Sequence, residues 1–143
     1  MLGFLVALVS GILMSVQGVF NTQVTKTTGV WVSSGWVQLS AFAICVIFWL
    51  ATGRDSVASL GEVSPKYMLL GGVLGAGITW TVIMSMSMLG PAKAALLIVV
   101  AQVLCAYLIE LLGMFGVEKQ PVNMWKIAGM AIALVGLIIF ENQ

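Results

Sequence analysis

Histidine is absent from this sequence of 143 residues, and charged residues are scarce. Lys and Arg together number 6 and Asp and Glu 5, which is 8% of the chain, whereas 61% of the residues are apolar and the mean hydropathy is +1.13. A soluble domain of this size has more surface than so few charged side chains can cover, and it would aggregate. The composition therefore predicts an integral membrane protein.

Other absences exclude several classes of function. There is no histidine, and the two cysteines, Cys45 and Cys105, lie inside apolar segments, so neither a metal site nor a disulfide framework is expected. The net charge is +1 and no basic cluster is present, so a nucleic-acid partner is not expected either. Because the chain has no nucleophile–base set and no paired acids in one apolar segment, we expect no enzyme activity and no cofactor.

Five apolar segments are long enough to cross a bilayer as helices. We expect a single transmembrane domain over 1–143, with helices at about 2–20, 31–51, 67–89, 92–115 and 124–140. The polar stretches 21–29, 52–66 and 116–123 are expected to connect them, and Gly90-Pro91 separates the third helix from the fourth. A cleaved signal peptide is the alternative for the first segment, but it has no basic start and is longer than a usual signal core.

The positive charges between these segments predict an orientation. Five spans place the two termini on opposite sides of the membrane. The side of the N-terminus carries Arg54, Lys66, Lys119 and Lys126, and the other side carries Lys26 and Lys93. This bias predicts a cytoplasmic N-terminus, and it is small enough to permit insertion of the chain in both orientations.

Small residues recur at helical spacing in two of the segments. Gly71 and Gly75 form a G-x-x-x-G pair in the third segment, and Gly129, Ala133 and Gly136 follow one another in the fifth. Small residues at this spacing let helix backbones approach closely in lipid. We expect packing within the chain, and a dimer contact is the alternative for the fifth helix.

The fourth segment carries the two polar side chains Gln102 and Glu110. Polar groups are costly in hydrocarbon, so each is a functional-site hypothesis. A helical wheel places them on either side of a face of small residues around Ala106, as in the wall of a cavity. The alternatives are a helix–helix hydrogen bond for Gln102, and for Glu110 the headgroup region or a pair with Lys126. In the functional interpretation, Glu110 exchanges a proton against a substrate.

Three further residues are candidates for the same cavity. Gln17 and Asn21 are four residues apart and share one face at the end of the first helix. They either mark its exit from the membrane or lie at the entrance of a binding site. Trp80 lies near the middle of the third segment, on the opposite side of the helix from Gly71, and faces either lipid or a cavity in which its ring stacks on a solute.

A family resemblance joins these observations. The pieces V-Q-G-V-F-N (16–21), L-G-G-V-L-G-A (70–76), L-G-P-A-K-A-A-L-L-I-V-V-A-Q-V-L (89–104) and L-I-E-L-L-G-M-F-G (108–116), in this order and spacing, resemble the YdcZ-type branch of the drug/metabolite transporter superfamily. Gln17, Gly18 and Asn21 match the first-helix motif of that branch, Gln102 matches its fourth-helix amide, and Glu110 lies where many members carry an acid, usually Asp. The first helix has no acid, unlike that of the small multidrug exporters of the superfamily.

The resemblance implies a fold and a function. The expected fold is an all-α integral membrane protein of five transmembrane helices, one half-repeat of the ten-helix transporter fold, in the bacterial cytoplasmic (inner) membrane. The implied function is secondary transport or export of small molecules by alternating access between inverted repeats. One chain holds one repeat, so an antiparallel homodimer or a heterodimer with an oppositely oriented paralogue is expected in the lipid. A non-transporting membrane subunit or assembly factor is the alternative.

Overall fold

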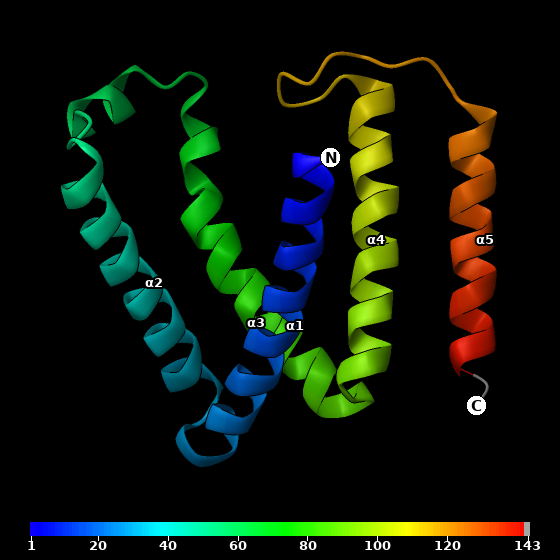
Figure 1. Cartoon of the computed structure of the whole chain (residues 1–143), viewed down its shortest axis with the longest axis horizontal. Helices are drawn as coiled ribbons and strands as arrows, with labels where there is room; N and C mark the ends of the chain where they lie inside the picture. Colours follow the sequence, from blue (N-terminus) through cyan, green and yellow to red (C-terminus); the bar gives the residue numbers. More distant parts are fainter. Residues whose placement is uncertain (142–143) are drawn as a thin grey trace. The chain divides into compact units, whose positions relative to one another are not determined.

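The computed structural model describes residues 1–141, which form α-helices and short 3-10 helices and no strand (Figure 1). The predicted all-α fold with five apolar helices is confirmed. In chain order the elements are α1 (Leu2–Thr28), α2 (Val30–Thr52), the 3-10 helices η1 (Val57–Glu62) and η2 (Lys66–Leu70), α3 (Gly71–Leu89), α4 (Pro91–Leu112) and α5 (Met124–Glu141).

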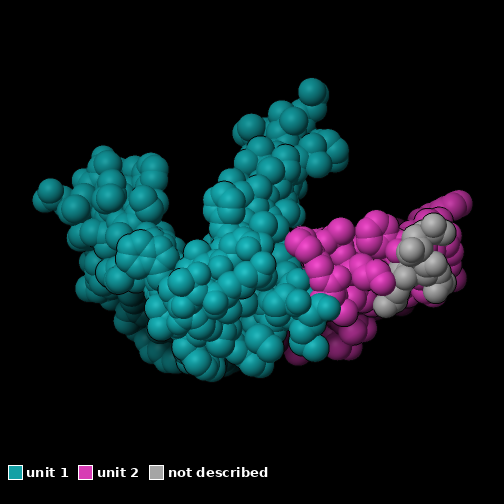
Figure 2. All heavy atoms as spheres, turned by 90° about the horizontal axis from the view of Figure 1, so that it is seen from below, with its two compact units in different colours: residues 1–88 teal, residues 89–143 magenta. Residues whose placement is uncertain are grey.

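The chain divides into two compact units, Met1–Met88 and Leu89–Gln143 (Figure 2). α1, α2, α4 and the segment Lys66–Leu89 are long and apolar enough to cross a membrane, and α5 is a shorter apolar helix. At most 6% of the most apolar window of each of the four long helices is buried within the chain. Their apolar side chains are therefore left to contact lipid or another protein, since they do not form a core of their own.

The first helix is longer than the expected 2–20, because the polar run 21–29 continues as helix up to Thr28. The hydroxyls of Thr22, Thr25 and Thr28 donate to the carbonyl four residues earlier, at 2.8, 2.8 and 3.0 Å. These hydroxyls are satisfied inside the helix, so a run of threonines does not end it. Gly29, with a φ of 83°, ends α1 and allows α2 to start immediately, and the two helices form a V (Figure 1).

Two other boundaries also differ from the expectation. The third span begins with the 3-10 helix η2, and the α-helix starts at Gly71 and not at residue 67. The fourth helix ends at Leu112 and not at residue 115, because Gly113 takes a left-handed conformation with φ 67° and ψ 40°. α5 covers the expected 124–140, and its 18 residues correspond to about 27 Å, close to the thickness of about 30 Å of a bilayer core.

The buried residues of the first unit lie on all three of its α-helices, and four of the seven are polar. The Ser33 hydroxyl of α2 donates to the Asn21 carbonyl of α1 at 3.1 Å. The side chain of Met86 on α3 packs against Gly18 of α1, where an added Cβ would lie 2.6 Å from both Sδ and Cε of Met86. The buried set is Gly18, Asn21 and Thr22 of α1, Ser33 and Ser34 of α2, and Ile83 and Met86 of α3.

The small residues predicted as packing positions contribute little to contacts within the described chain. A Cβ added at Gly75 would lie 3.6 Å from Nε2 of Gln38, an ordinary contact. At Gly71, Gly129 and Gly136, an added Cβ would have no described atom within 4 Å apart from its chain neighbours and the adjacent backbone of its own helix. Among the described glycines, Gly18 is therefore the one where an added side chain would meet the tightest contact.

Candidate functional site

A groove of about 360 Å³ lies between α4 and α5, entirely within the second unit. α4 and α5 run side by side, joined by the connection 113–123 (Figure 1). The groove is apolar along most of its length and has charged side chains near the connected helix ends. Its lining residues are Val103, Ala106, Tyr107 and Glu110 of α4 and Lys126, Gly129, Met130 and Ala133 of α5.

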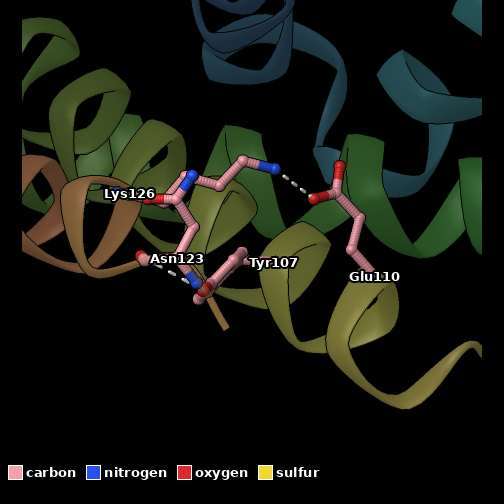
Figure 3. A network of polar contacts seen from close by, with 4 residues as sticks. All are labelled: Tyr107, Glu110, Asn123 and Lys126. Carbon is pink, nitrogen blue, oxygen red and sulfur yellow. Dashed lines mark hydrogen bonds and ion pairs between the residues drawn. The ribbon is translucent and has the colours of Figure 1, made fainter. Parts of the chain in front are cut away.

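An ion pair marks the charged end of this groove. Nζ of Lys126 donates to Oε2 of Glu110 at 2.7 Å (Figure 3). Glu110 lies two residues before the end of α4, and Lys126 is the third residue of α5. The two side chains are 39% and 50% exposed, so they can be reached by a third charged group. Pairing makes the site electrically neutral, which explains how an apolar helix accommodates a carboxylate.

Tyr107 adds an aromatic face to the ion pair. It lies three residues before Glu110, which puts both side chains on the same face of α4. Tyr107 is buried, and Nζ of Lys126 lies 5.6 Å from the centre of its ring. At this distance the negative face of the ring attracts the ammonium group. Lys126 therefore has two partners on α4, a carboxylate and a ring.

The hydroxyl of Tyr107 holds the start of α5. It accepts a hydrogen bond from the backbone N–H of Asn123 at 3.0 Å and donates to the carbonyl of the same residue at 3.4 Å (Figure 3). The Asn123 side chain in turn caps α5, since its Oδ1 accepts from the backbone N–H groups of Trp125 and Lys126 at 2.9 and 3.4 Å. The tyrosine and the cap together fix the helix turn from which Lys126 extends.

The connection between α4 and α5 is tied back to the end of α4. The backbone N–H of Gln120 donates to the carbonyl of Glu110 at 2.9 Å, and the N–H of Met114 donates to the carbonyl of Ile109 at 3.1 Å. These bonds satisfy carbonyls that a helix end would otherwise leave free. The residue that carries the carboxylate is thus also an anchor of the loop that leads to Lys126.

The structure separates the two polar residues predicted on the fourth helix. Glu110 lines the groove together with Ala106, the centre of the predicted face, whereas Gln102 is exposed and is not part of the lining. The helical wheel places Gln102 about 80° from Glu110, and α5 covers the Glu110 side. The alternative that Glu110 pairs with Lys126 is the arrangement that the structure contains.

A second groove, of about 560 Å³, lies between α1 and α2 in the first unit and brings Gln17 and Asn21 together. Asn21 is 9% exposed, and its backbone carbonyl accepts the hydroxyls of Thr25 and Ser33. The lining is Gln17, Phe20, Asn21 and Val24 of α1 and Trp36, Val37, Ser40, Ala41, Ile44 and Cys45 of α2.

Trp80 lies outside both grooves. Its ring stacks on that of Trp31, with the centroids 6.3 Å apart and an interplanar angle of 13°. The partner of Trp80 in this structure is therefore an aromatic side chain at the start of α2. Next to this stack, Nε2 of Gln38 donates to the hydroxyl of Thr79 at 3.5 Å, a second link between α2 and α3.

Sequence reasoning missed Tyr107 and Asn123. Both carry a signal: a tyrosine three residues before an acid shares its helix face, and an asparagine directly before an apolar run is typical of a helix start. Residues 1–141 contain no group of three His, Cys, Asp or Glu side chains that could hold a metal ion.

Comparison with known proteins identifies a family. The model of a family described as "Putative inner membrane exporter, YdcZ" matches residues 2–139. No curated protein and no solved structure matches the chain.

Proposed function

Because this chain belongs to the YdcZ family of inner membrane exporters, we propose that it exports small molecules by alternating access as an inverted-repeat dimer. The family match and the membrane-length helices make it a multi-pass protein of the inner membrane. The family is one of exporters and not of enzymes. The N-terminus is expected in the cytoplasm, with insertion in both orientations as the alternative.

The observation that carries this proposal is the charged groove between α4 and α5. Ionisable side chains in membrane helices are expensive, and they mark substrate and ion pathways more often than packing positions. Glu110 and Lys126 face one another across an apolar groove with room for a small solute. Both side chains are partly exposed, so a solute or a proton can reach the carboxylate.

The number of repeats supports the dimer. A transporter with alternating access needs two repeats of opposite orientation that meet at a shared site. Residues 1–141 supply five α-helices, and most of their apolar side chains are exposed. The second repeat comes from an antiparallel copy of this chain or from an oppositely oriented paralogue. In this arrangement Gln17, Asn21, Trp80, Gln102 and Glu110 are proposed to line the shared cavity.

Transport in proteoliposomes tests the proposal. The purified protein is assayed with one labelled solute of each charge class: ethidium, lactate, alanine and glucose. We expect movement of at least one class, with loss of transport in Glu110→Gln and reduced transport in Gln102→Ala. Glu118→Gln, which removes a carboxylate from the connection, is the matched control and should transport normally. If neither Glu110→Gln nor Gln102→Ala changes transport, the assignment of the cavity is wrong; if no class moves, a non-transporting subunit is the better description.

Orientation is tested with single cysteines. In a background with Cys45→Ala and Cys105→Ala, the variants Lys26→Cys and Arg54→Cys are labelled from each side of the membrane with an impermeant maleimide. An antiparallel homodimer requires each position to be labelled from both sides. One fixed orientation in the absence of any partner protein contradicts the inverted dimer.

A further inference from the structure

The ammonium group of Lys126 occupies a place that suits any organic cation. A carboxylate oxygen lies 2.7 Å from it and the centre of an aromatic ring 5.6 Å from it, and both groups belong to α4. Carboxylates bind ammonium groups through charge-assisted hydrogen bonds or Coulomb attraction, and ring faces attract the same groups. The cation itself comes from the other helix, α5.

The rest of the groove suits an apolar body attached to such a cation. Beyond the ion pair the lining consists of Val103, Ala106, Gly129, Met130 and Ala133. Met side chains adapt to ligands of different shapes, and the small residues leave room along the groove. The groove should bind an anion more weakly, because the carboxylate and the ring face both repel it and the one lysine in the lining is already paired.

We propose that the groove between α4 and α5 is a binding site for lipophilic ammonium ions, and that Lys126 is a tethered competitor for it. The ammonium head of the solute takes the place of Nζ between Glu110 and Tyr107, and Lys126 swings out. This inference rests on the proposed function and gives it a substrate class.

The exchange is physically reasonable because it replaces one cation by another. Glu110 is never left unpaired, so the cost of an isolated charge in an apolar helix is avoided. Lys126 is 50% exposed and lies at the start of α5, from which its long flexible side chain can reach the headgroup region. Tyr107 does not need to move, since Asn123 holds its hydroxyl in place.

Calorimetric titration of the detergent-solubilised protein, above neutral pH, tests the competition. The probes are phenyltrimethylammonium and, as an anion with the same ring, benzenesulfonate. Lys126→Met removes the competitor. An ion pair of partly exposed groups is worth at most about 1 kcal/mol, so we expect about fivefold tighter binding of the cation. Glu110→Gln should abolish binding of the cation. The matched controls Lys119→Met and Glu118→Gln change the same charges in the connection and should bind like the original protein.

A second substitution tests the same idea with the ion pair kept. Lys126→Arg can bind the carboxylate through two hydrogen bonds, so it should compete better and weaken binding of the cation. Unchanged or weaker binding in a folded Lys126→Met variant overturns the proposal, and so does binding of benzenesulfonate that is lost in that variant. The titration needs no transport. A protein that exports another solute but does not bind the cation therefore refutes this site alone, and the proposed function stands.

Discussion

Tyr107→Phe should loosen the first turn of α5 and leave the aromatic face of the groove in place. The substitution removes a hydroxyl that accepts from Asn123 N–H at 3.0 Å and donates weakly to its carbonyl at 3.4 Å. A neutral hydrogen bond contributes about 0.5–1.5 kcal/mol, and more if a buried donor is left without a partner. Asn123 is exposed, so water or a headgroup can replace the hydroxyl. We therefore expect the lower half of that range, about 0.5–1 kcal/mol.

Hydrogen exchange of the protein in micelles measures this effect directly. A loss of about 0.5–1 kcal/mol corresponds to about a two- to fivefold faster exchange of the Asn123 amide. The first turn of α5 should exchange faster as well, while α4 stays as protected as before. Ser87→Ala is the matched control, since it also removes a hydroxyl, one that bonds only within its own helix at 2.8 Å. Unchanged exchange at Asn123, or an equal loss of protection along both helices, would refute the role of the hydroxyl as a clamp.

Three further substitutions probe other contacts, each by unfolding in mixed micelles. Trp80→Ala should cost about 0.5–1.5 kcal/mol beyond the lost apolar burial, because it removes the stack on Trp31. The double variant with Trp31→Ala should then cost less than the sum of the two single variants, and simple additivity would contradict a contribution of the stack. Gly18→Val should cost about 1 kcal/mol, the lower end of the range for overpacking, because it overlaps the flexible end of the Met86 side chain. A shorter side chain at position 86 should relieve this cost, and no relief would place the strain elsewhere. Glu110→Lys and Lys126→Glu should each destabilise by opposing like charges, and the double variant should recover, unless the ion pair contributes nothing.

Much of the helical framework follows from the sequence alone. Long apolar runs predict the number of helices, and Gly90-Pro91 predicts the break before α4, which begins at Pro91. These features depend on solvation, which a residue's own chemistry largely determines.

The boundaries at threonines and glycines were less predictable. The run 21–29 is polar in composition, but its hydroxyls bond to the helix that carries them, so α1 continues to Thr28. In the second unit, Gly113 ends α4 in a left-handed turn, two residues before the apolar run itself ends. Hydropathy does not report either effect, because both depend on backbone hydrogen bonds and dihedral angles.

The candidate site shows a similar division. Single residues such as Glu110 and Asn21 stand out because a polar group in an apolar helix needs a reason. Which of these residues share a groove depends on which helix faces are covered by a neighbouring helix. An evenly apolar helix has no polar face, so its sequence does not predict the covered side. Gln102 and Glu110 are only about 80° apart on α4, yet α5 covers one and leaves the other exposed.

The pairing of Glu110 with Lys126 also constrains how a proton could take part in export. A proton that neutralises the carboxylate leaves Lys126 as an uncompensated cation in the groove, so protonation favours movement of the lysine side chain toward the headgroups. A cationic solute has the same effect on the lysine, because it occupies the same carboxylate. Under the proposed function, proton and solute would compete for Glu110, and either would release the same side chain. The proposed exchange would use the carboxylate on α4, and α1 contains no acidic residue.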